Sequence, residues 1–115
     1  MNYVSHKIEV AQAFDELSIL EIKKSKLKNQ KLKKLLKQQI VILKKEISQT
    51  IGNDLTKRIY YSDFYTNLFN SNMDIFLSVD KFKNSEPAQL NMKRIDAKKA
   101  LQEKFFRKSL EEIKM

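Results

Sequence analysis

The chain has one Gly and one Pro among its 115 residues, and this scarcity limits its folds more than any other feature. Tight β-turns and phosphate-binding loops depend on Gly, because Gly adopts positive φ angles without a steric penalty. All-β folds and phosphate-loop folds are therefore nearly excluded, and long helices are expected. Because 42% of the residues are hydrophobic, we expect a folded core even though 32% are charged.

The composition also excludes several kinds of functional site. The chain has no Cys, so it has no disulfide framework, no thiolate zinc site and no Cys nucleophile. Its single His, His6, cannot form a site with several imidazole ligands, and a lone His near a terminus is typical of the surface. We therefore predict no catalytic residues, no cofactor and no metal, and we favour a protein that is not an enzyme.

Apolar residues at steps of three and four predict a single all-α domain over residues 1–115, an antiparallel bundle of about four helices. The first helix begins at Val10 and loses its pattern near residue 26. Its apolar positions cover more than half of its circumference, so we expect it to contact two neighbours. The second helix starts after a capping residue, Asn29, and ends before Gly52, where a left-handed C-terminal residue is expected.

The last two helices are expected to be the longest, over residues 55–83 and 87–114. Asn53 or Asp54 is expected to cap the third helix, and Pro87 opens the fourth. A polar residue interrupts the third helix's apolar seam, where it either fixes the packing register or faces a solvated gap. The seam consists of Tyr61, Phe64, Leu68, Asn72, Ile75, Val79 and Phe82.

The net charge of +9 is concentrated in the first half, where residues 23–45 hold ten Lys and no acidic residue. Such a run is either a solvated helix face or a surface that attracts nucleic acid, anionic lipid or acidic protein. The absence of Arg from the run argues against base reading. The candidates for nucleic-acid or anion binding are Lys23, Lys24, Lys26, Lys28, Lys33, Lys34 and Lys37, together with Arg94 and Lys98 as the lining of an anion pocket.

An aromatic cluster at the start of the third helix is the most unusual local feature. It could belong to the core and a dimer interface, or it could stack on the bases of single-stranded nucleic acid. Helical spacing favours the core and the interface, and long helices with exposed apolar ends favour a homodimer. The interface candidates are Tyr60, Tyr61, Phe64, Tyr65 and Phe69.

The segment VAQAFDELSILEIKKSKL, residues 10–27, resembles the opening of an uncharacterised family of small helical proteins of marine bacteria and their viruses. That family opens with V-G-E-x-x-D-K-x-[ST]-I-L-x-I-K before a Lys-rich helix, and Ala11, Gln12 and Glu16 depart from it. A later family segment, L-x-x-x-N-x-x-[LI]-[WF]-x-x-[ED], is similar to residues 68–80, and the terminal helix is similar to KKALQEKFFRKSLEEIK. The resemblance implies a helical domain and no chemistry. It marks three polar positions, Asp15, Asn72 and Asp80.

Together these patterns predict a non-enzymatic helical interaction module that is homodimeric, binds another protein and carries a basic face on its first two helices. One alternative is a sequence-nonspecific nucleic-acid-binding protein, and another is a small helical-bundle enzyme or anion-binding protein. No segment has the roughly 18–20 apolar residues of a membrane span, and no signal peptide is evident. We therefore expect a cytoplasmic protein, in the host cytoplasm if it is viral.

Overall fold

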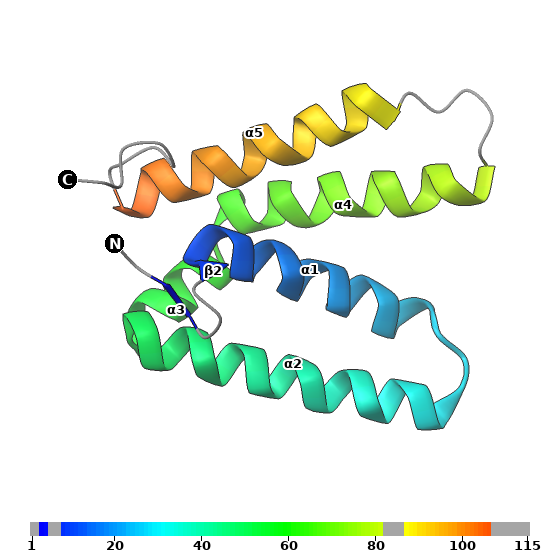
Figure 1. Ribbon diagram of the computed structural model, residues 1–115, viewed down its shortest axis with the longest axis horizontal. Coiled ribbons are helices and arrows are strands. Elements are labelled where there is room, and N and C mark those ends of the chain that lie inside the picture. Colours follow the sequence, from blue (N-terminus) through cyan, green and yellow to red (C-terminus); the bar gives the residue numbers. More distant parts are fainter. Residues whose placement is uncertain (1–2, 5–7, 82–86, 107–115) are drawn as a thin grey trace.

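The computed structural model describes residues 3–4, 8–81 and 87–106, and the all-α fold class is confirmed (Figure 1). A small antiparallel pairing of β1 (Tyr3–Val4) with β2 (Ile8–Glu9) precedes the helices. The helices are α1 (Val10–Lys26), α2 (Gln30–Ile51), α3 (Asn53–Tyr60), α4 (Asp63–Lys81) and α5 (Pro87–Phe106).

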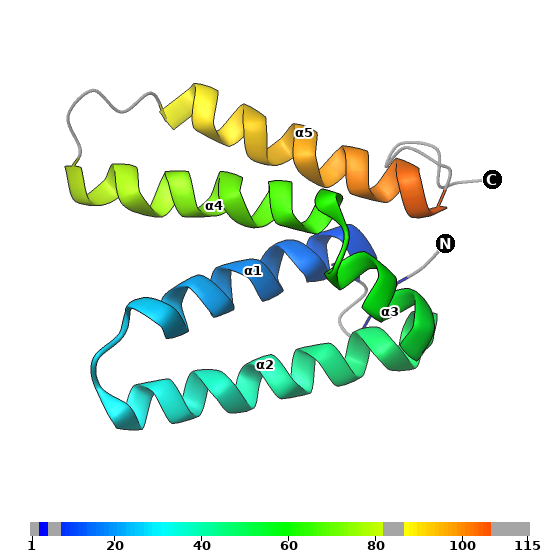
Figure 2. The ribbon, with the colours of Figure 1, turned by 180° about the vertical axis from the view of Figure 1, so that it is seen from behind.

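Helix α1 is the central element of the fold. It lies between α2 and α4 in both views of the ribbon, while α5 packs along α4 on the outer side (Figures 1 and 2). It contacts α2, α4 and α5, which is one more helix than its sequence predicted. The molecule measures 43 × 33 × 24 Å, so every long helix lies close to the surface on at least one side.

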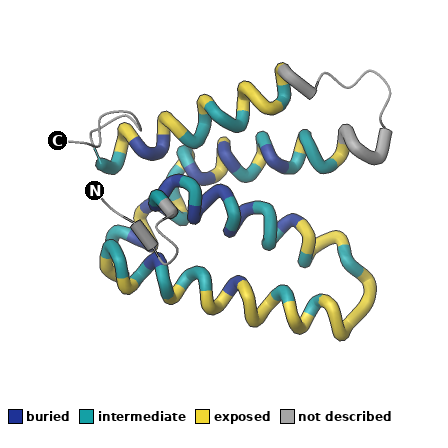
Figure 3. The backbone as a smooth tube through the Cα atoms, in the orientation of Figure 1, coloured by how far each residue is buried: buried dark blue, intermediate teal, exposed yellow. Residues whose placement is uncertain are grey.

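The core follows from the apolar stripe of α1. Phe14 is fully buried and Leu17 is 1% exposed, against Ile47 of α2, Leu68 of α4 and Leu101 of α5. Helix α2 contributes much less, since only two of its residues are buried (Figure 3). Burying a large aliphatic or aromatic side chain contributes about 1.5–3 kcal/mol, so most of the stabilising burial is centred on α1.

The joints on either side of α2 form as the sequence predicted. The Asn29 side chain accepts hydrogen bonds from the backbone N–H groups of Lys31 and Leu32, at 2.9 and 3.1 Å. Gly52 ends α2 with φ of +93°. The expected cap of the next helix was wrong, because Gly52 itself is the N-cap of α3 and Asn53 and Asp54 already lie in its first turn.

The predicted third helix is two helices, so the described residues contain five helices instead of about four. The chain turns at Ser62, whose hydroxyl donates to the Ile59 carbonyl at 2.6 Å and accepts from the Tyr65 backbone N–H at 3.3 Å. These local bonds replace the helical ladder and start α4. Because the helix stops there, Tyr61 leaves the predicted seam and is 79% exposed. Within the described residues α2 is the longest helix, with 22 residues, against 19 in α4 and 20 in the described part of α5.

Several predicted features lie outside the described residues. These are His6, Phe82 and residues 107–114 of the predicted last helix. Val79 and Asp80 lie in α4, but their side chains are also outside the description. Pro87 begins α5 as predicted.

The conformation of Gly52 gives a first prediction. Its φ of +93° and ψ of 155° belong to a region that residues with a Cβ rarely adopt, although no atom would contact an added Cβ. Replacing Gly52 with Ala should therefore lower the free energy of unfolding by about 1–3 kcal/mol through backbone strain alone. Urea unfolding followed by circular dichroism measures this. Gln38→Ala, at an exposed position of α2, is the control and should change the free energy of unfolding by less than about 0.5 kcal/mol. An equal effect of the two substitutions would contradict the prediction.

Candidate functional site

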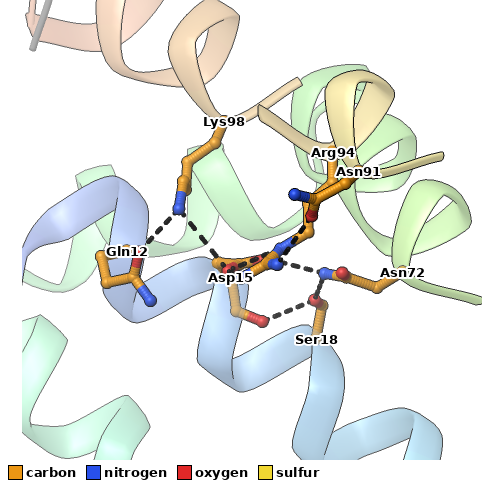
Figure 4. A network of polar contacts seen from close by, with 7 residues as sticks. All are labelled: Gln12, Asp15, Ser18, Asn72, Asn91, Arg94 and Lys98. Carbon is orange, nitrogen blue, oxygen red and sulfur yellow. Dashed lines mark hydrogen bonds and ion pairs between the residues drawn. The ribbon is translucent and has the colours of Figure 1, made fainter. Parts of the chain in front are cut away.

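A buried carboxylate on α1 is the centre of the largest polar network described (Figure 4). Asp15 is 0% exposed, yet it faces two cationic side chains of α5. The guanidinium of Arg94 donates to it from Nη2 at 2.7 Å and from Nε to both oxygens at 3.2 Å. This fork-like geometry is the strongest form of an Arg–carboxylate pair, and it joins α1 to α5.

Helix α4 joins the same network through an amide. Asn72, which is 5% exposed, donates from Nδ2 to the Asp15 carboxylate and to the Ser18 hydroxyl, both at 2.7 Å. The Ser18 hydroxyl in turn donates to the Asp15 backbone carbonyl at 2.7 Å. Of the two alternatives for Asn72, the structure shows the buried one, in which the amide fixes the position of α4 against α1.

Lys98 completes the network on the side of the first turn of α1. Its ammonium donates to Gln12 Oε1 at 2.7 Å and lies 3.8 Å from Asp15 Oδ2. The side chains of Lys98 and Arg94 are 16% and 28% exposed, so both reach solvent at one edge.

The polar groups of the network are paired with one another, and this pairing determines which chemistry the network can perform. The hydrogen bond to Asp15 raises the pKa of Arg94, so the guanidinium stays charged. The charge of Asp15 is in turn neutralised by the two cations of α5. The sequence proposed Arg94 and Lys98 as the lining of an anion pocket. In the structure their contacts with Asp15 and Gln12 hold helices together, and this lends no support to an anion pocket.

A second carboxylate of α1 binds the aromatic cluster. Glu21 accepts hydrogen bonds from the phenols of Tyr60 and Tyr65, at 2.5 and 2.7 Å. Lys44 of α2 lies 3.9 Å from Glu21 and 4.4 Å from the centre of the Tyr60 ring. Sequence spacing gave no signal for this site, because Glu21 and Tyr65 are 44 positions apart.

The five aromatic candidates have different environments. Tyr65 is buried, with Phe14 edge-on at 5.8 Å and Tyr60 stacked at 5.0 Å. Phe64 packs against Phe105 of α5, and Phe69 is half-buried. Tyr61 alone among the five is exposed in the single chain, so the cluster mostly belongs to the core side of the two alternatives.

The lysine candidates between residues 23 and 37 lie at the end of α1, in the α1–α2 turn and along α2. Lys24 and Lys33 are half-buried, whereas five others are exposed: Lys23, Lys26, Lys28, Lys34 and Lys37. Two of these exposed side chains, Lys23 and Lys26, line a groove of about 420 Å³ that the sequence did not reveal. Its lining is mostly apolar and comes from three elements: Lys23, Lys26 and Leu27 at the end of α1, Leu32, Leu35, Leu36 and Gln39 of α2, and Phe76 of α4.

Comparison with protein-family models, curated proteins and solved structures found no match, so the family resemblance stays a prediction. Among the described residues, no three His, Asp or Glu side chains gather in a way that could hold a metal ion. None of the described helices is both long and apolar enough to cross a bilayer.

The Asp15 network gives a second prediction. Asp15→Asn removes the charge that neutralises two partly buried cations, so the variant should lose about 3 kcal/mol of unfolding free energy. This is the low end for a broken buried pair, because Arg94 and Lys98 reach solvent. Thermal and urea unfolding measure the loss. Asp74→Asn, at an exposed position of α4, is the matched control and should change stability by less than about 0.5 kcal/mol. Similar losses in both variants would show that Asp15 does not hold the helices together.

The Glu21 cluster gives a prediction on pH. Burial raises the pKa of Tyr65 above the ordinary value of 10.0, and the hydrogen bond to Glu21 raises it further. The folded state disfavours the phenolate form of Tyr65. The stabilisation that this phenol contributes is therefore complete below pH 10 and is lost as pH rises above it. Tyr65→Phe should be about 1–2 kcal/mol less stable than the wild type at pH 8, where Glu21 loses a donor. That difference should shrink by pH 11.

Urea unfolding at pH 8, 10 and 11 tests this expectation. Tyr61→Phe is the matched control. Tyr61 is 79% exposed, so this substitution should leave the pH dependence of stability unchanged. A constant difference between the wild type and Tyr65→Phe over this range would contradict the prediction.

Proposed function

We propose that this protein is a non-enzymatic helical interaction module whose binding surface is the outer side of α2 together with the end of α1. The observation that carries the proposal is the exposure of large apolar side chains on α2. On one side of α2, Leu32, Leu35 and Ile42 are 47%, 53% and 57% exposed. Single exposed apolar residues are ordinary, but several on one helix beside an apolar groove are typical of a binding surface.

The distribution of charge supports the same surface. The buried polar groups of α1 are paired within the molecule, with Arg94, Asn72 and the two tyrosines. Helix α2 carries exposed lysines at positions 31, 34, 37 and 45, and Lys23 and Lys26 at the end of α1 are exposed beside them. The module therefore uses α1 to hold its helices together and α2 to meet a partner.

The homodimer expected from the sequence stays a prediction, and so does the cytoplasmic location. Of the aromatic residues expected at a dimer interface, Tyr61 has the exposure that an interface needs. Self-association through α2 would bring the two lysine-rich segments together, which like-charge repulsion disfavours. A dimer, if it forms, therefore uses another face.

Nucleic-acid binding is a second candidate function, favoured by the five exposed lysines at the end of α1, in the α1–α2 turn and on α2. Such binding would depend on phosphate contacts and would weaken steeply with salt. The surface has no Arg between residues 23 and 45, and its lining is apolar, so protein binding is the better-supported proposal.

The proposal predicts that binding in the native host depends on α2. A tagged chain should retain specific proteins after nuclease treatment, and the double variant Leu35→Gln, Ile42→Gln should lose them. Val41→Gln is the matched control, since Val41 is as exposed as Ile42 but lies on the opposite side of α2 from Leu32 and outside the groove lining. Binding should then be reproduced with the purified partner by calorimetry, with at least a tenfold loss in the double variant. Retention of the same proteins by the double variant, or loss of all binding with nuclease, would contradict the proposal.

A further inference from the structure

We propose that the groove between the α1–α2 turn and α4 binds an amphipathic helix of a partner protein that carries acidic residues beside its apolar anchors. The inference rests on the proposed function and names the chemistry of the partner. Three observations carry it: the shape of the groove, the continuation of its apolar lining along α2, and the charge at its rim.

The groove has the size and chemistry of a binding site for apolar side chains. Its volume of about 420 Å³ lies within the range of about 300–1,000 Å³ that is usual for ligand pockets. Leu27, Leu36 and Phe76 form partly buried walls, while Leu32 and Leu35 are about half exposed at its edge. Walls of this kind favour an apolar occupant over water, because removing apolar surface from water is favourable.

The apolar edge continues along the helix beyond the groove. One side of α2 carries Leu32, Leu35, Gln39 and Ile42, at steps of three, four and three; three of these four side chains are apolar and Gln39 is polar. This side differs from the one that faces the core, where Ile40 and Ile47 are buried. Ten residues at 1.5 Å per residue give a stripe of about 15 Å, so a helix of about three turns could lie along it. Binding of an amphipathic helix through anchors at such spacing is a recurring recognition mode.

The rim of the groove decides between partners. Lys23 and Lys26 line it and are exposed, and they belong to a stretch of ten Lys without a single acidic residue. A second copy of this chain would place the same positive stretch against itself. A segment with Glu or Asp flanking its apolar anchors would instead complement the rim in charge, which speeds association and excludes like-charged partners. Nucleic acid would satisfy the lysines but leave the apolar walls uncovered.

The probe for this proposal is a synthetic 18-residue peptide with Leu at positions i, i+3, i+7 and i+10, Glu on both flanks and one Trp. The protein has no Trp, so Trp fluorescence reports on the peptide alone. Two control peptides carry Lys instead of Glu on the flanks, or the same residues with the apolar order scrambled. The Glu peptide should bind at least tenfold more tightly than either control. Its affinity should fall several-fold between 50 and 500 mM salt, but it should persist because the anchors are apolar.

Variants of the protein locate the binding site. Leu32→Gln and Leu35→Gln should each weaken binding of the Glu peptide at least fivefold, and Lys26→Glu should weaken it and remove most of the salt dependence. Val41→Gln, which is outside the groove lining, should stay within twofold of the wild type. All the changed positions are exposed, and urea unfolding of each variant checks that the fold is intact.

Four outcomes would overturn the proposal: equal binding of the Glu and Lys peptides, wild-type affinity in both leucine variants, a dimer by sedimentation that Leu35→Gln dissociates, or competition by an oligonucleotide that Leu35→Gln does not weaken. The proposed function has its own test in the α2-dependent binding of host proteins. If that binding is found while the Glu peptide fails, the module stands and the acidic helix is wrong. If the binding of host proteins and the binding of the Glu peptide both fail, the proposed function and the acidic helix are both wrong.

Discussion

The fold depends on one buried ionic interaction, the pairing of the Asp15 carboxylate of α1 with Arg94 of α5. An unpaired charge at a fully buried position would be very costly, so this carboxylate can be accommodated only where α5 supplies a cation and α4 supplies the Asn72 amide. The α4–α5 hairpin is thereby fixed in direction and register against α1, which apolar packing alone would specify less sharply. Asp15 also lies 3.8 Å from Lys98, so this carboxylate contacts two of the chain's cations.

A second carboxylate of α1, that of Glu21, positions other helices in the same way. Glu21 binds phenols from α3 and α4 and lies near Lys44 of α2, so one helix provides the acidic partner for all of its neighbours. The carboxylates of Asp15 and Glu21 therefore hold helices in position. Helix α2 packs along α1 but buries only Ile40 and Ile47, and a second side of it faces outward with leucines and lysines. A helix that is left apolar on a second side is the element best suited to meet another chain.

The residues that break helices were predictable, and long-range polar contacts were not. Asn29, Gly52 and Pro87 each act through local backbone geometry, so their type and position were enough to place three joints. The turn at Ser62 was missed, although Ser followed by Asp63 is a helix-start signal, because the aromatic spacing across it continued the apolar seam. Asp15, Asn72 and Arg94 were marked individually, for different reasons. That they form one network depends on the packing of α1, α4 and α5, which no local pattern contains.

The groove shows why exposed apolar surface was harder to predict than the core. Leu32 and Leu36 belong to the same apolar run in the sequence, yet Leu36 is partly buried in the wall of the groove while Leu32 is 47% exposed at its edge, and Phe76 of the distant α4 completes the lining. Lysine spacing has the same limit, since the rim lysines differ from the other lysines only in what lies beside them. The charge of the first half therefore gains a specific meaning from the fold. Lys23 and Lys26 line an apolar cleft. Under the proposed function, a partner that covers the cleft would bring apolar anchors and negative charge together, which would disfavour a nucleic acid and a second copy of this chain at this face.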